Sequence, residues 1–233
     1  MMVSVVVRTK NEERWIGRCL AALRHQDHSS FEVIVVDNAS TDGTRAIVER
    51  FGCALLSISA AEFTHGRSIN LGIAAARGEL VAILSGHCIP VHERWLRRLS
   101  LPFADAHVAG VYGRQEPLPD TSHIDKRDLW TTFGLDRRVQ RKDYFFHNAN
   151  AMIRKSVWAR LPFHEGIAGV EDRHWAKRVL AQDGRIVYEP EACVYHYHGI
   201  HHGGDEARAS RVVKVIELIK TDRVAPDVVS SKQ

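Results

Sequence analysis

Short runs of apolar, mostly β-branched residues alternate with single amphipathic segments over the first half of the chain. The runs are Val3–Val7, Phe31–Val36, Cys53–Ile58 and Leu80–Leu84. Continuous apolar runs of this length are typical of strands buried on both faces, and one helix between two strands favours a right-handed crossover. The alternation therefore predicts an α/β fold with a doubly wound, mostly parallel sheet.

Short polar residues before the amphipathic segments indicate where helices begin. We expect Asn11 to cap a helix that carries Trp15, Ile16, Leu20 and Leu23, because asparagine is a favoured N-cap. Two further helices are predicted, from Thr41-Asp42-Gly43-Thr44 to about Phe51 and over Ser68–Ala76.

The second half of the chain is less regular. After a strand at Val108–Tyr112, residues 113–143 contain two prolines and many charges, which predicts a loop with one helix near Lys126–Gly134. The other expected elements are strands at Phe145–Ile153, Ile186–Glu189 and Cys193–Tyr197 and helices at Val170–Gln182 and Ala207–Thr221. We predict a single domain over residues 1–224, followed by a loosely ordered tail at 225–233.

Composition limits the partners and the compartment. The chain has 233 residues, of which 45% are hydrophobic, with a net charge of +4 and no polybasic run. This balance favours anionic small molecules or membrane surfaces and argues against nucleic acid. The four cysteines are scattered and form no C-x-x-C pair, which is typical of reduced, cytoplasmic thiols. The chain enters a strand directly, so we expect no signal peptide, and no apolar run is long enough to span a membrane, so we expect a soluble protein.

Polar side chains stand where the predicted strands end. The strand Leu80–Leu84 is followed by Ser85-Gly86-His87, and the first two strands are followed by Thr9-Lys10-Asn11-Glu12 and by residues 37–44. Ligands of open parallel sheets bind beyond these carboxyl ends, where a histidine can bind metal or transfer protons. Asp37 can accept a nucleobase N–H there, although helix capping also explains these residue types. Glycine-rich dinucleotide and P-loop signatures are missing.

The stretches VVVRTKNEERWIGRCLAAL, VIVVDNASTDGT and INLGIAAARGELVAILSGH resemble, in order and spacing, the nucleotide-sugar half of the family 2 glycosyltransferases, which have the GT-A fold. FFHNANAMIRKSVW and GVEDRHWAKRVL resemble the acceptor-side elements of that family. THGRSINLGI and VAGVYGRQEPLP are most similar to bacterial rhamnosyltransferase-type members. The resemblance implies a nucleotide-sugar-binding half at residues 1–115 and an acceptor-side half at 116–224.

The resemblance also implies roles for single residues. The nucleotide sugar would be held by Thr9, Asn11, Glu12, Asp37, Arg67, Asn70 and Ser85. In the family an Asp-x-Asp triplet that binds a divalent cation follows the fourth strand, and here Ser85-Gly86-His87 takes its place. His87-Cys88 resembles the Asp-x-His-Cys arrangement of the polypeptide N-acetylgalactosaminyltransferases, with serine in place of the first aspartate.

A metal at His87 needs further ligands, and residues 195–202 offer four histidines. His196 and His198 would share one face of a strand, since side chains alternate along it, whereas His201 and His202 are expected in an exposed loop. Imidazole ligands favour Mn²⁺ or a similar ion over Mg²⁺, which prefers oxygen. The alternative is that the strand-end histidine is a hydrogen-bonded structural residue.

Glu171-Asp172 opens a predicted helix, where acidic residues are favoured by the helix dipole alone. The resemblance implies instead that Asp172 is the base for the acceptor hydroxyl and that Glu171 supports it. An inverting transfer requires such a carboxylate on the face of the anomeric carbon opposite the leaving diphosphate.

Other polar residues are candidates for the acceptor or the diphosphate: Arg114, His147, Asn148 and Asn150. For the last three, turn or edge chemistry is the alternative. The last helix carries basic residues beside an apolar stripe, so it can lie on lipid, pack on its own core or contact a second subunit.

The sequence therefore predicts an inverting glycosyltransferase that uses a UDP- or dTDP-linked sugar and a surface saccharide or lipid-linked acceptor. We expect it in the cytoplasm or at the inner face of the membrane, where it can contact the membrane peripherally or assemble into a homodimer. The alternatives are a metal-dependent hydrolase of nucleotide sugars and a non-catalytic nucleotide-sugar binder.

Overall fold

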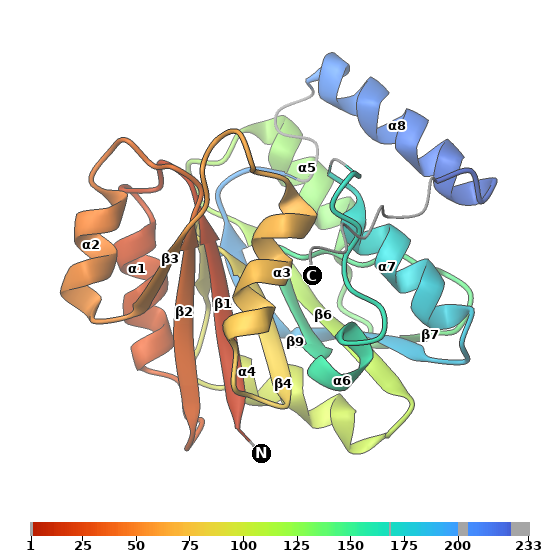
Figure 1. The fold of residues 1–233 in the computed structure, drawn as a ribbon, viewed down its shortest axis with the longest axis horizontal. Coiled ribbons are helices and arrows are strands. Elements are labelled where there is room, and N and C mark those ends of the chain that lie inside the picture. The colour runs from red at the N-terminus through yellow and green to blue at the C-terminus, as the bar shows by residue number, and fades with distance from the viewer. Residues whose placement is uncertain (1, 168, 200–204, 225–233) are drawn as a thin grey trace, which may run out of the picture.

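A computed structural model describes residues 2–167, 169–199 and 205–224 (Figure 1). Helices and strands alternate through the first half and become irregular in the second. The strands are β1 Val3–Thr9, β2 Phe31–Asp37, β3 Ala54–Ser57, β4 Leu80–Ser85, β5 Cys88–Pro90, β6 Val108–Pro117, β7 Arg138–Gln140, β8 Asn150–Arg154 and β9 Arg185–His196. The α-helices are α1 Ile16–Arg24, α2 Thr44–Phe51, α3 His65–Ala75, α4 Trp95–Ser100, α5 His123–Thr132, α6 Lys155–Trp158, α7 Glu171–Leu180 and α8 Glu206–Lys220, and a 3₁₀ turn spans Leu101–Ala104.

The strands form one sheet in the order β3-β2-β1-β4-β8-β6-β9-β5, with β7 paired to β9. Strands β3, β2, β1 and β4 are parallel, β8 runs antiparallel to both β4 and β6, and β6 is parallel to β9. The register pairs Thr9 with Asp37 and Arg8 with Ser85, so the carboxyl ends of β1, β2 and β4 meet at one edge. The predicted α/β fold with a mostly parallel sheet is confirmed.

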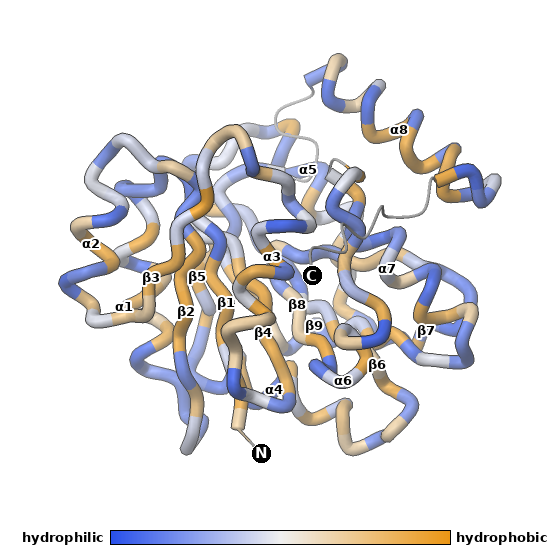
Figure 2. The backbone as a smooth tube through the Cα atoms, in the orientation of Figure 1, coloured by the Kyte–Doolittle hydropathy of each residue, from blue (hydrophilic) through white to orange (hydrophobic). Residues whose placement is uncertain are grey.

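Two apolar cores cover the two faces of the sheet. Successive residues of β1 alternate between them, because strand side chains point to opposite faces: Val5 and Val7 join the core under α1, α2 and α4, whereas Val6 joins the core under α3, α5 and α7. Figure 2 shows the hydrophobic residues concentrated in the sheet and polar residues on the outer turns. A fully buried side chain of this size contributes about 1.5–3 kcal/mol, so the central strands are a rigid support for the residues at their ends.

Several predicted bounds were wrong, each for a local reason. Asn11 does not cap α1: its φ of 53° places it in a turn, and the residue before α1 is Trp15. The helix expected at Lys126–Gly134 begins at His123, because the Ser122 side chain accepts a hydrogen bond from the Asp125 amide. The two short strands expected after residue 185 are the single strand β9, and of Phe145–Ile153 only the last part is β8.

Helix α8 packs against its own chain. Its apolar face contacts Ile167 and Val170, which lie in the segment before α7, and the α8 residues in this small core are Val212, Val215, Ile216 and Ile219. The Lys177 ammonium of α7 donates to the Ile219 carbonyl over 2.5 Å and so holds the C-terminal end of α8. None of the helices in the described part of the chain is long and apolar enough to cross a membrane. The predicted tail and the pair His201–His202 lie outside the described residues.

Candidate functional site

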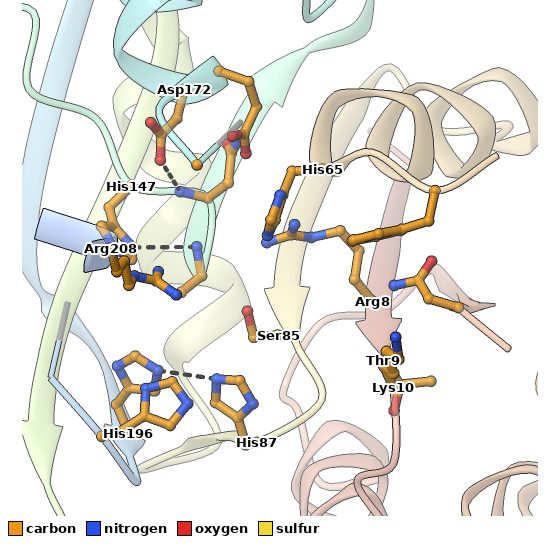
Figure 3. A pocket seen from close by; sticks show the side chains of 17 residues that line it. Arg8, Thr9, Lys10, His65, Ser85, His87, His147, Asp172, His196 and Arg208 are labelled. Carbon is orange, nitrogen blue, oxygen red and sulfur yellow. Dashed lines mark hydrogen bonds between the residues drawn. The ribbon is translucent and has the colours of Figure 1, made fainter. Parts of the chain in front are cut away.

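A cavity of about 180 Å³ opens at the edge where β1, β4 and β9 end (Figure 3). Helices α3, α7 and α8 and the turn before β8 complete its wall, so segments far apart in the sequence meet there. The predicted site residues that line it are Thr9, Ser85, His87, His147, Asn148, Glu171, Asp172, His196 and His198. This edge is the location that a parallel α/β sheet favours for a ligand.

Three histidine rings converge at one end of the cavity. One ligand nitrogen from each of His87, His196 and His198 lies within 4.8 Å of the others, and the Nε2 atoms of His87 and His196 are 3.0 Å apart. The antiparallel pairing of β5 with β9 places Cys88 opposite His196, which brings the neighbouring His87 alongside. Strand β9 ends at His196, so His198 joins the group from the bend beyond the strand and not through strand alternation.

The chemistry of the three rings suits a metal ion. The Glu12 carboxylate contacts His87 Nδ1 over 2.6 Å, which leaves His87 Nε2 facing the other two rings. A carboxylate behind a ligating histidine fixes its tautomer and raises its basicity. Burial, and next the His87 ring, lower the pKa of His198 to about 4, so its imidazole is neutral near pH 7, the form that binds metals.

The opposite end of the cavity holds the acidic pair that begins α7. The Asn148 backbone N–H donates to Asp172 Oδ2 over 3.2 Å, and the Asn148 amide donates to Glu171 Oε1 over 3.3 Å. Burial, followed by the adjacent Glu171 charge, raises the pKa of Asp172 to about 7. A carboxylate with such a pKa can accept a proton near neutral pH, as a general base must.

Two buried oxygens without partners lie at the ends of neighbouring strands. Within the described residues, Thr9 Oγ1 and Asp37 Oδ1 make no hydrogen bond, while Asp37 Oδ2 accepts from the Ser40 amide over 3.2 Å. Unsatisfied buried polar atoms are rare in native proteins and are typical of places where a ligand completes the hydrogen bonding. Asn11, by contrast, does not line the cavity: its Oδ1 accepts from the Thr41 amide over 2.8 Å.

Asn70 and Arg67 lie outside the cavity, contrary to the expectation that they face the diphosphate or the donor sugar. Asn70 donates to the Phe163 carbonyl over 2.8 Å and accepts from the Trp158 indole over 2.8 Å, so it fastens α3 to the segment after α6. Arg67 forms an exposed ion pair with Glu62.

Asn150 and Arg114 also do not line the cavity. The buried Asn150 amide donates to the Ala192 carbonyl over 2.8 Å and accepts from the Trp95 indole over 2.9 Å, which ties β8 to β9 and α4. Arg114 forms an ion pair with Glu116. Asn150 therefore stabilises the sheet, whereas the ion pair of Arg114 lies within the single strand β6.

The cavity is also lined by residues that were not predicted as site residues: Arg8, Lys10, Asn38, Phe63, His65, Ala149, Gly169 and Arg208. Arg8 had a detectable signal, because a charged residue interrupts the apolar run of the first strand immediately before Thr9. Arg208 had none, since only the fold brings α8 back to the end of β1.

Comparison with known proteins matches most of the chain to the family that its sequence motifs resemble. The family model "Glycosyl transferase family 2" matches residues 4–161. The chain is 29% identical over 208 residues to the O-antigen chain rhamnosyltransferase WbaN of Salmonella anatum, covering 84% of this chain and 66% of the relative. It is 31% identical over 186 residues to the glycosyltransferase AglE of Haloferax volcanii, covering 76% and 60%. The chain thus spans two thirds or less of the length of these relatives.

Solved structures agree in fold. The S. aureus TarS fragment 1–349 in complex with UDP superposes with a TM-score of 0.71 at 20% identity, covering 95% of this chain and 65% of that one. The mannosyltransferase PcManGT of Pyrobaculum calidifontis, solved with GDP-Man and Mn²⁺, gives 0.70 at 22% identity, covering 97% and 65%. The family match and the shared fold together lead to one conclusion: the chain belongs to glycosyl transferase family 2 and has the GT-A fold.

Proposed function

We propose that this chain transfers a sugar, with inversion, from a nucleoside-diphosphate sugar to a hydroxyl group of a glycan acceptor. The observation that carries the proposal is Asp172, a buried carboxylate with a pKa of about 7 that lines the cavity opposite the three histidines. Membership of the family supports the reaction class.

The nucleoside of the donor would bind at the ends of β1 and β2. Thr9 Oγ1 and Asp37 Oδ1 offer unused hydrogen-bonding capacity there. Solved structures of the same fold contain UDP, UDP-GlcNAc or GDP-Man, which supports a nucleotide sugar as the donor class. We propose a UDP- or dTDP-linked sugar, with Ser85 beside the diphosphate.

A divalent ion would be held by His87, His196 and His198, with Glu12 orienting His87 through the 2.6 Å contact. When bound, such an ion would neutralise charge on the diphosphate leaving group. All-imidazole donors favour Mn²⁺ over Mg²⁺. The neutral His198 and the carboxylate behind His87 are the features of the chain that fit a metal.

Asp172 would take the proton of the attacking hydroxyl as the new glycosidic bond forms. The Asn148 N–H holds one of its oxygens and the Arg173 N–H donates to the other over 2.7 Å, so the carboxylate is oriented before the acceptor arrives. The Glu171 charge keeps the proton affinity of Asp172 high. His147 and Asn148 line the same part of the wall and are proposed to contact the acceptor.

The acceptor is proposed to be a surface saccharide or a lipid-linked glycan; the relative WbaN is named as an O-antigen chain rhamnosyltransferase. Peripheral contact of α8 with the inner face of a membrane and assembly into a homodimer stay predictions.

The test is a transfer assay with UDP- and dTDP-sugars, run with Mn²⁺, with Mg²⁺ and with excess EDTA, for the wild type and Asp172→Asn. We expect nucleotide release that requires an acceptor, depends on metal and is lost in Asp172→Asn while nucleotide binding persists. Undiminished turnover in that variant would refute the assignment of the base. Sugar release without an acceptor would indicate the hydrolase, and tight binding without turnover on any acceptor would indicate the binder.

A further inference from the structure

Besides Lys10, three basic side chains that the proposed reaction does not use line the cavity. Arg8 comes from β1, His65 from the first residue of α3 and Arg208 from the first turn of α8, and Figure 3 shows them around the middle of the cavity. All three side chains are partly buried. Because the elements lie far apart in the sequence, this gathering of positive charge is a product of the tertiary fold.

The two arginines lack carboxylate partners. Among the described residues, neither Arg8 nor Arg208 forms an ion pair within 4.0 Å, whereas arginines such as Arg14, Arg77 and Arg185 do. Arg8 Nε is buried and makes no hydrogen bond in the described part of the chain. Buried donors of a guanidinium are costly to leave unsatisfied, so a group that binds there gains affinity by satisfying them.

Glu171 acts electrostatically on both His65 and Arg208, and Asp205 acts on Arg208 as well. Along the cavity wall, three cationic side chains, Arg8, Lys10 and Arg208, face two carboxyl groups, Glu171 and Asp172. Burial, the largest effect, lowers the pKa of His65, so His65 supplies a hydrogen-bond donor more than a charge. The cavity therefore keeps an excess of positive charge beside the acidic pair.

The position of this charge determines which substrate it faces. In an inverting displacement the acceptor approaches from the side of the base, and the diphosphate leaves on the opposite side. The three histidines proposed to serve the diphosphate lie at the other end of the cavity from Asp172 (Figure 3). A group bound beside Glu171 by Arg8 and Arg208 thus belongs to the acceptor side.

We propose that Arg8 and Arg208, assisted by His65, bind a phosphoryl or carboxylate group carried by the acceptor, so that the enzyme selects an anionic glycan. This inference rests on the proposed function, because it takes Asp172 as the base that marks the acceptor side. The first turn of α8 then serves as part of the acceptor site.

The test uses sodium sulfate, a tetrahedral dianion that does not precipitate manganese, with ionic strength held constant by chloride. Melting temperatures are measured for the metal-loaded, UDP-saturated protein across a sulfate titration, since a ligand of the native state raises the melting temperature. Arg208→Gln is the variant, because Arg208 lies on a peripheral helix and its loss should leave the sheet intact. Arg211→Gln, an exposed arginine on the same helix outside the cavity, is the matched control.

We expect sulfate to stabilise the wild type and Arg211→Gln equally, with at least about tenfold weaker sulfate binding in Arg208→Gln, the effect of losing charge-assisted hydrogen bonds. UDP affinity should be equal in all three proteins. Sulfate that displaces UDP, or that binds Arg208→Gln as well as the wild type, would overturn the proposal. Arg208-dependent sulfate binding in a protein that binds no nucleotide would support the anion site and refute the proposed donor.

Discussion

Replacing Asp172 by asparagine should make the protein more stable at alkaline pH while it removes the proposed base. The pKa of this carboxyl rises from its ordinary value of 3.8 to about 7 through burial and the Glu171 charge. Such a difference corresponds to about 4 kcal/mol between the protonated and ionised forms. Asparagine has nearly the same shape and never ionises, so it avoids this cost.

The sign follows from proton linkage. Between pH 3.8 and about 7 the folded protein keeps a proton on Asp172 that the unfolded chain has lost, so the wild type loses stability as pH rises through this range. From pH 5 to pH 8 the loss amounts to about 3 kcal/mol. The backbone N–H groups of Asn148 and Arg173 donate to the two carboxyl oxygens of Asp172, and asparagine replaces one of these oxygens by an NH₂ group that cannot accept. Losing that hydrogen bond costs about 1 kcal/mol of stability, and this cost does not depend on pH.

Urea unfolding of both proteins at pH 5 and pH 8 measures the effect. The free energy of unfolding of Asp172→Asn, relative to the wild type, should increase by about 3 kcal/mol between the two pH values. Asp136→Asn, which removes an exposed carboxylate, is the control and should show no such change. An equal difference at pH 5 and pH 8 would mean that Asp172 is ionised throughout, and the explanation of its role by burial would be wrong.

Three further outcomes are expected. Glu12→Gln should weaken Mn²⁺ binding, measured by calorimetry, about 10- to 100-fold, because it removes the carboxylate that orients a ligating histidine; equal affinity would exclude that role. The rate of sugar transfer should rise with pH through a midpoint near 7, the pKa of Asp172. Glu171→Gln should move this midpoint to lower pH, because the neighbouring charge raises the pKa of Asp172. An unmoved midpoint would assign the titration to another group. Gly72→Ala should lower the free energy of unfolding by about 1–3 kcal/mol, because the added methyl group would collide with side chains of β1 and β2. Gly134→Ala is the control in the same urea unfolding experiment and should leave the stability unchanged, because its methyl group would have no atom within 4 Å.

Local patterns were sufficient for the sheet. The apolar runs that begin at Val3, Phe31 and Leu80 became β1, β2 and β4 with bounds within two residues, because a strand buried on both faces leaves a continuous apolar signature. The second half was predicted less well. Strand β9 contains Pro190 and the exposed Glu191, which break the apolar pattern into two pieces, although hydrogen bonds to β6 continue on both sides of them.

Site residues at strand ends were predictable for the same reason that the strands were. Thr9, Ser85 and His87 lie within three residues of the end of an apolar run, so their place at the sheet edge follows from the sequence. Asn70 and Asn150 show the limit of this reasoning, because an asparagine that binds a ligand and one that ties two strands together look alike until its partners are known.

The sequence by itself determined the α/β architecture, the edge at which polar residues collect and the presence of an acidic pair at a helix start, because these depend on local periodicity and chain order. Only the tertiary structure decided the rest. It brought His198 from beyond β9 to His87, returned Arg208 from α8 to Arg8 on β1 and buried Asp172 beside Glu171. Metal affinity, anion affinity and a shifted pKa depend on distances between groups and on their removal from water, and these are set by packing between segments far apart in the chain.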